Sequence, residues 1–265
     1  MKSFDFEYDG IRLSDKGFII CKFDSNGIET VSNGSYITFN TVSTMRGAKY
    51  ELMSSEYSDC LKTSFQICKH PCIVDDGEIT ILEQREIMQW LNRKEFHKFK
   101  LLDDVEYTNI FFEASFNISK IECDGKVYGF ELEMFTNRPY ALQEPIFLNL
   151  ENTTTNGQKQ ILSKSDEEGY IYPDMEIVIA ADGDFEFYND LEKRTMRIAN
   201  CKAGEVISVS YPMISSSLAS HKIQNDFNWK FFRIANTLRA KVNNVTISLP
   251  CTITMKYHPI IKVGI

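Results

Sequence analysis

The sequence contains no apolar run close to the roughly 20 residues that a membrane-spanning helix needs. Its first ten residues alternate charged and aromatic side chains, without the apolar stretch that a signal peptide has. A basic excess is missing too, because 29 lysines and arginines face 37 acidic residues and the net charge is −8. Such a chain has no surplus of cations to displace counterions from phosphates. We therefore expect no signal peptide, no membrane insertion and no sequence-specific nucleic acid partner.

Signatures of catalytic and nucleotide-binding sites are also missing. There is no GxGxxG, no phosphate-binding lysine loop and no HExxH zinc motif. Of the four histidines, His221 has serine neighbours at 215–217 and 220, but no nucleophile turn such as GxSxG surrounds them. The acidic pairs at 75–76, 103–104 and 182–184 are interpreted as turns, because a glycosidase needs two carboxylates that face each other across a cleft. We expect no catalytic residue, no cofactor and no enzymatic activity.

Cysteine is present seven times, an odd number, and mostly at isolated positions. The one cluster, Cys68-Lys69-His70-Pro71-Cys72, lacks the second close pair of ligands that a four-ligand metal site requires. The acidic turns lack the EF-hand pattern of a calcium loop. A buried free cysteine packs as a small apolar residue. The sequence therefore predicts reduced, structural thiols and no metal site.

What the sequence does contain, most clearly between Met175 and Tyr257, is alternation with a period of two. Apolar residues recur at every second position in short bursts, and polar residues fill most of the gaps. This pattern is typical of half-buried antiparallel strands joined by short turns. It predicts a β-sandwich, a class of domain that mostly binds and assembles.

The first half of the chain is predicted to be mostly β with one helix. The helix begins after Thr80, which has the spacing of a capping box with Glu83, and it ends near Asn92. Trp90 falls on the apolar stripe of this helix, which predicts a core residue rather than a ligand platform. Residues 46–58 are polar and poorly periodic, which predicts a long loop or an irregular hairpin. Strands are expected near residues 4–8, 17–23, 36–42, 64–73, 99–102, 109–119 and 127–135.

Two breaks in these patterns, at Asn137–Tyr140 and at Gln143–Pro145, predict a domain boundary near residue 140. We expect an N-terminal domain at residues 1–139 and a C-terminal domain at residues 140–265. In the second domain, four aromatic residues are candidates for stacking on sugar rings. The alternative is that they cover a sheet edge or a domain contact. These residues are Tyr170, Tyr172, Tyr188 and Trp229.

The order and spacing of short motifs along essentially the whole chain resemble the distal tail protein (Dit) family of long-tailed phages and prophages of Gram-positive hosts. In the first half the matching segments are Phe4-x-Phe6-x-x-x-Gly10, residues 17–23, Arg85–Leu91, and Leu101–Asp104 followed by Tyr107. In the second half they are Tyr172-Pro173, Gly183-Asp184, Asn189, Lys202–Glu205, Phe231–Ile234, Asn244-Val245 and Tyr257–Pro259. Residues 238–243 depart from the family, because a glycine-containing turn is expected there.

The resemblance implies that the N-terminal domains form a hexameric ring around the tail channel, with a galectin-like antiparallel β-sandwich as the C-terminal domain outside it. The ring would join the tail tube to the tail-associated lysin or fibre protein and would anchor baseplate or receptor-binding proteins. It implies a virion protein of the tail tip, made in the bacterial cytoplasm. Since a ring contact is head to tail, each protomer needs two complementary surfaces, and edge strands of the first domain are candidates.

Two other classes of function remain as alternatives. A carbohydrate-binding module for host-surface glycans would present exposed tyrosine or tryptophan with polar partners on one sheet face, since galectin-like sandwiches can bind sugars. An esterase or glycosidase would need a nucleophile or an opposed carboxylate pair in a cleft. The sequence supplies scattered aromatics for the first alternative and neither feature for the second.

Overall fold

The computed structural model describes residues 3–23, 34–43, 49–71, 77–103, 105–237 and 239–263. The chain divides into two units, one of Met1–Leu142 with Lys262–Ile265 and one of Gln143–Ile261. Both units are built mainly from antiparallel strands, which confirms the predicted mainly β fold class. Among the described residues, no helix is long and apolar enough to cross a membrane.

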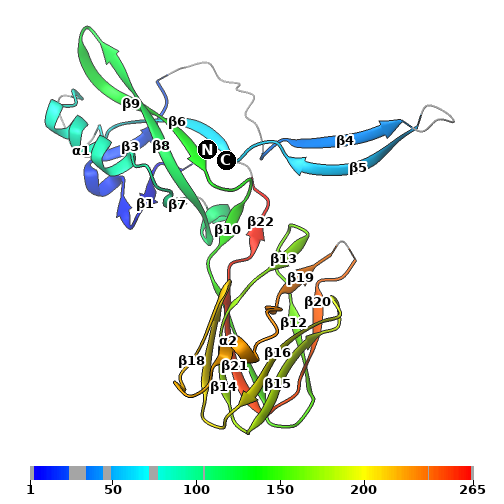
Figure 1. The fold of residues 1–265 in the computed structure, drawn as a ribbon. Coiled ribbons are helices and arrows are strands. Elements are labelled where there is room, and N and C mark those ends of the chain that lie inside the picture. The colour runs from blue at the N-terminus through cyan, green and yellow to red at the C-terminus, as the bar shows by residue number, and fades with distance from the viewer. Residues whose placement is uncertain are drawn as a thin grey trace. The chain divides into compact units, whose positions relative to one another are not determined.

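The sheet of the first unit follows the order β2-β1-β7-β8-β9-β6-β3, and each neighbouring pair is antiparallel. Its long strands β8 and β9 form the long green hairpin of Figure 1. The strands of this unit are β1 (Phe6–Tyr8), β2 (Ile11–Arg12), β3 (Phe18–Cys21), β4 (Ile37–Ser43), β5 (Tyr50–Tyr57), β6 (Lys62–Lys69), β7 (His97–Leu101), β8 (Ile110–Cys123), β9 (Lys126–Thr136) and β10 (Ala141–Gln143).

The helix α1 (Ile81–Leu91) begins and ends where the sequence predicts. Its capping box is complete, because the Thr80 hydroxyl accepts the Glu83 N–H and the Thr80 N–H donates to the Glu83 carboxylate at 2.7 Å. Trp90 is buried and stacks on Phe6 with ring centroids 5.7 Å apart. Its indole N–H donates to the Tyr8 carbonyl at 3.1 Å, so the ring is a core residue with a satisfied donor.

Replacing Thr80 by alanine is expected to lower the free energy of unfolding by about 1 kcal/mol, because the N–H of Glu83 then loses its capping acceptor. Urea unfolding followed by circular dichroism measures this change. Thr80→Ser keeps the hydroxyl and serves as the matched control, with an expected loss near zero. Equal losses for the two variants would show that the cap contributes nothing through its hydrogen bond.

Strands β4 and β5 form a two-stranded sheet of their own and pair with no other strand of the described residues. Figure 1 shows them as a separate ribbon. A register shift between Asn40 and Thr41 marks a β-bulge, so the irregular-hairpin interpretation of residues 46–58 holds at 50–57. The long-loop interpretation is wrong there, and residues 44–48 lie outside the described residues. We call β4 and β5 together the arm.

The second unit is a sandwich of a five-stranded sheet, β11-β21-β14-β17-β18, and a four-stranded sheet, β12-β20-β15-β16, with a short pair β13-β19. A helix that the sequence did not predict, α2 (Ile223–Asp226), follows β18. The strands are β11 (Ile146–Asn152), β12 (Gly157–Leu162), β13 (Gly169–Ile171), β14 (Asp174–Ile179), β15 (Gly183–Asn189), β16 (Arg194–Cys201), β17 (Val206–Ser210), β18 (Met213–Ser216), β19 (Ile234–Asn236), β20 (Val242–Ile247), β21 (Cys251–Tyr257) and β22 (Ile260–Ile261).

Alternating burial along these strands confirms the period-two pattern. In β14 every second residue is buried, and β20 and β21 follow the same rule. The inward side chains of both sheets form one apolar core, in which Phe187 stacks on Phe232 with ring centroids 4.1 Å apart. The outward side chains of the two sheets form the surfaces of this unit.

Candidate interaction surfaces

The arm has one apolar face and one polar face. Pairing of β4 with β5 across the bulge puts five side chains with large apolar portions on one side, where most are strongly exposed. Phe39 is 62% exposed and Leu52 is 57% exposed. The apolar face carries Ile37, Phe39, Tyr50 and Leu52, with Tyr57, which also contacts the Tyr140 ring, and with the smaller Thr41, Ser43 and Ser55. The opposite face carries Thr38, Asn40, Val42, Glu51, Ser54 and Glu56.

Cross-strand hydrogen bonds hold the polar face together. The Asn40 amide donates to the Ser54 hydroxyl at 3.0 Å, and the hydroxyls of Thr38 and Ser58 lie 3.0 Å apart. The hydrocarbon side chains of the apolar face cannot form such hydrogen bonds. A two-stranded hairpin is only marginally stable in water when no other surface covers it. Contiguous exposed apolar side chains with a polar reverse side are typical of a surface that another protein covers.

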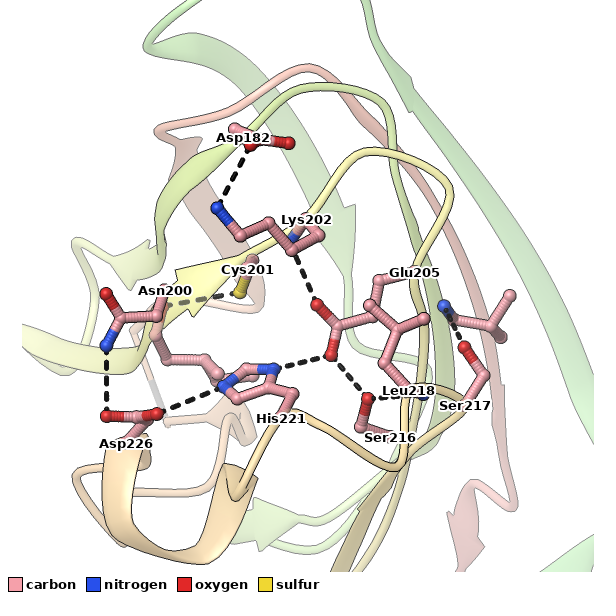
Figure 2. Close-up of polar contacts among 12 residues, drawn as sticks. Asp182, Asn200, Cys201, Lys202, Glu205, Ser216, Ser217, Leu218, His221 and Asp226 are labelled. Atoms are coloured by element: carbon pink, nitrogen blue, oxygen red, sulfur yellow. Dashed lines mark hydrogen bonds and ion pairs between the residues drawn. The ribbon is translucent and has the colours of Figure 1, made fainter.

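A buried polar cluster in the second unit contains the one serine–histidine neighbourhood that the sequence suggested (Figure 2). Glu205, which has no exposed area, accepts hydrogen bonds from the Ser216 hydroxyl and the Lys202 N–H. The His221 Nδ1 lies 2.6 Å from the same carboxylate, and its Nε2 lies 3.3 Å from Asp226 Oδ2. The His221 Nε2 is buried without a hydrogen-bond partner among the described residues, so Glu205 is the carboxylate that holds the ring.

In this geometry Ser216 is not positioned to act as a nucleophile that His221 activates. Its hydroxyl donates to Glu205 rather than to His221, so the structure brings both residues to one carboxylate instead of to each other. The side chain of His221 is only 4% exposed. The cluster ties the residue before β17 to the end of β18 and to α2 (Figure 2).

Acid is expected to destabilise the second unit through Glu205. Burial alone would raise the pKa of this carboxyl, but its hydrogen bonds with Ser216, the Lys202 N–H and His221 hold the pKa below its ordinary value of 4.5. A carboxyl whose pKa is lower in the folded state stabilises the fold above the unfolded value, and this contribution disappears as the pH falls through the folded value. Urea unfolding from pH 7 to pH 3, compared between the wild type and Glu205→Gln, measures it. The stability difference between the two proteins should shrink with falling pH, and a constant difference would contradict the assignment.

Three of the four aromatic sugar-stacking candidates lie in an aromatic–arginine cluster. The Arg233 guanidinium lies 3.7 Å from the centroid of the Tyr170 ring. Tyr172 stacks on Tyr211 with centroids 4.2 Å apart, and Trp229 lies against Phe231. For Tyr170 and Tyr172, one ring face is therefore occupied by a neighbour of the same chain, which fits residues that cover a sheet edge.

The fourth candidate, Tyr188, lies elsewhere, in a hollow of about 630 Å³ on the outer face of the four-stranded sheet. We call this hollow the polar groove. It is lined by Gln158, Lys159, Gln160, Tyr188, Asp190, Asn244, Val245 and Thr246. A second hollow of about 410 Å³ lies on the outer face of the five-stranded sheet, where its lining includes Phe147, Asp174, Glu176, Met213 and Lys256.

The cysteines and acidic turns form no metal site within the described ranges, where no group of three or more histidine, cysteine or acidic residues is placed to hold an ion. Cys72, residues 75–76 and residue 104 lie outside those ranges. The six described cysteines are free thiols. Burial raises the pKa of Cys251 to about 11, so this thiol stays protonated and packs as an apolar residue. Asp182 and Asp184 accept backbone N–H groups of Ala203 and Asn200, as turn carboxylates do.

Comparison with known proteins gives matches in sequence families and in folds. Residues 1–138 match a family model described as a phage tail protein N-terminal domain, and residues 140–257 match one described as a phage tail C-terminal domain. A comparison with curated protein sequences finds no match.

Among solved structures, the chain is similar to the Dit (gp 19.1) protein of phage SPP1, which is described as a paradigm of the hub adsorption apparatus in phages that infect Gram-positive bacteria. The TM-score is 0.65 at 11% sequence identity, over 97% of this chain and 99% of that one. At this identity the likeness establishes the fold. Together with the two family models, which cover nearly the whole chain, it shows that the protein belongs to the phage tail protein family and has the fold of a distal tail protein.

Proposed function

We propose that the protein is the structural hub of a phage or prophage-derived tail tip, where six copies form a ring. The ring joins the tail tube to the tail-associated lysin or fibre protein and anchors baseplate and receptor-binding proteins of a host-attachment apparatus. The protein acts by assembly and carries out no catalysis. The likeness in fold to the SPP1 hub protein over both whole chains supports this proposal.

The observation that carries the proposal is the one-sided apolar face of the arm. Its five exposed or half-exposed side chains, defined above, have their polar counterparts on the reverse side. A ring gives this face a cover, because a head-to-tail contact places the arm of one protomer on a different surface of the next. Six equivalent contacts then close, and every apolar face is removed from water.

The contacts of the reactive side chains support the proposal that the protein carries out no catalysis. The Glu205 carboxylate contacts both Ser216 and His221, and Asp182 and Asp184 accept hydrogen bonds from backbone N–H groups. Each of these groups therefore has a structural role that accounts for its position. A glycan-binding function is the second candidate, and the polar groove is the observation that favours it.

Light scattering of the purified protein over a range of concentrations tests the ring. We expect a species with six times the mass of the 30.6 kDa chain, or pairs of such rings, at high concentration. Negative-stain images of the same sample should show six-fold rings. A species that stays at the mass of one chain at all concentrations, both alone and after mixing with its tail partners, would overturn the proposal.

A further inference from the structure

The polar groove is built by three strands that are far apart in the sequence and adjacent in the sheet. β20 lies between β12 and β15 (Figure 1). The register places Gln158, Thr246 and Tyr188 side by side in one row across these strands. Gln160 lies opposite Asn244 in the next row, and the backbone N–H of Asp190 donates to the Asn244 carbonyl there. Two parallel rows of outward side chains thus line one face.

The side chains of these rows form a set of hydrogen-bonding groups with little net charge. Amides of Gln158, Gln160 and Asn244 each carry a donor and an acceptor. Asp190 is the one charged residue of these rows. Lys159, the one cation among the described lining residues, lies opposite the buried Val245 and so on the other side of its strand. Gln158, Gln160, Asn244 and Asp190 are exposed, so their polar atoms are available to a ligand. Such a surface matches a neutral molecule with many hydroxyl groups, each of which donates and accepts.

Hydrogen bonds within the chain orient the side chains of the groove and leave some of their donors and acceptors available to a ligand. The Gln160 amide donates to the Asn244 side-chain oxygen at 3.0 Å, which leaves the Asn244 NH₂ and the Gln160 oxygen for other partners. The Tyr188 hydroxyl points toward Asp190 at 3.5 Å. Within the part of the chain that the structure describes, no aromatic ring or cation packs on the Tyr188 ring. The faces of Tyr170 and Tyr172, by contrast, carry Arg233 and Tyr211.

The hollow on the five-stranded sheet has a different character. Its lining includes two carboxylates, Asp174 and Glu176, and an ammonium, Lys256. Two exposed apolar side chains, Phe147 and Met213, belong to the same lining. Asp174 is also engaged by the Ser210 hydroxyl at 2.6 Å. Charges and apolar side chains of this kind suit a protein contact better than a neutral sugar.

We propose that the polar groove is a binding site for a neutral oligosaccharide. The Tyr188 ring lies beside the apolar face of one sugar ring, and the amides of Gln160 and Asn244 exchange hydrogen bonds with its hydroxyls. Asp190 accepts from a further hydroxyl, as carboxylates readily do. The site lies on one chain, so it exists with or without a ring. This inference deepens the glycan-binding candidate function and rests on it, with a glycan of the host surface as the natural ligand.

Saturation-transfer NMR of the full chain with neutral trisaccharides at millimolar concentration tests the site. The probes are linear trisaccharides of glucose, galactose, N-acetylglucosamine and rhamnose, with a glycerol-phosphate oligomer as the charged comparison. We expect at least one neutral trisaccharide to bind. Tyr188→Ala and the double variant Gln160→Ala/Asn244→Ala should each weaken binding at least about tenfold, which corresponds to about 1.4 kcal/mol.

The matched control is Ser208→Ala/Thr254→Ala, two outward polar residues of the other hollow. This variant should bind the trisaccharide as the wild type does, and thermal unfolding should show that all variants are folded. Three results would overturn the proposal: no binding of any neutral probe, binding that the groove variants leave unchanged, and binding of the glycerol-phosphate oligomer alone. None of these results bears on ring formation, which the mass measurement tests separately.

Discussion

Glutamate at both Phe39 and Leu52 is expected to abolish the ring while each chain stays folded. Both side chains are more than half exposed in the single chain, so the substitutions remove no contact from its core. In the proposed ring, a neighbour would cover the same positions, and an unpaired carboxylate buried there would cost several kcal/mol. The dissociation constant of the ring should rise at least about a hundredfold. Light scattering over a concentration series measures this rise.

The control for the arm places the same charges on its other face. Thr38→Glu and Val42→Glu change two exposed residues of the polar face, one of them apolar, and leave Phe39 and Leu52 in place. This variant should assemble as the wild type does. If it loses the ring to the same extent as the Phe39 and Leu52 variant, charge on the arm would be the cause and the apolar face would have no special role.

Glu205→Ala is expected to have the largest effect on stability, a loss of about 3–5 kcal/mol in the free energy of unfolding. The substitution removes the acceptor of the Ser216 hydroxyl and the Lys202 N–H, and it leaves His221 buried beside a cavity. A buried donor without an acceptor costs its full desolvation free energy, and here several donors lose their acceptor at once. Urea unfolding at pH 7 measures the loss.

An exposed carboxylate of the same region provides the comparison. Asp182 pairs with Lys202 at 3.1 Å, and its side chain is 61% exposed. Asp182→Ala should therefore lower the free energy of unfolding far less than Glu205→Ala, because an exposed ion pair contributes little to stability. Similar losses for Glu205→Ala and Asp182→Ala would show that the buried cluster does not hold β17, β18 and α2 together.

The parts of this fold that the sequence predicts are those with local causes. The capping box of α1 needs two residues three positions apart, and both hydrogen bonds are present. Apolar and polar residues alternate along the strands of the sandwich because each strand has one face in the core. This alternation is visible in any short segment of the sequence. Trp90 is predicted correctly as a core residue for the same reason, since its neighbours on the helix face decide its burial.

The arm resists such a prediction for two physical reasons. Its bulge adds one residue to β5, so that Met53 shifts the alternation between the two halves of the strand. Neither face of the arm enters the core of its own chain, so apolar residues are not selected at every second position for internal packing. A loop and an irregular hairpin therefore look alike in the sequence at residues 46–58.

The surfaces depend on pairing between distant strands, which the sequence does not reveal. Tyr188 is recognised as a sugar-stacking candidate from its type, but its polar partners come from residues 158–160 and 244–246. Likewise, Glu205 joins Ser216 and His221 only because a turn and a strand end meet in the folded unit. Ser216 and His221 are close in the sequence and in the folded unit. Both contact the carboxylate of Glu205, which lies ten or more positions before them.

Electron microscopy of the purified protein together with its tail tube protein tests the central claim most directly. The account predicts class averages with six-fold symmetry, in which each arm lies on the neighbouring protomer with its apolar face covered. Single chains at every concentration, with an arm that contacts no second copy in the presence of the tail tube protein, would contradict it.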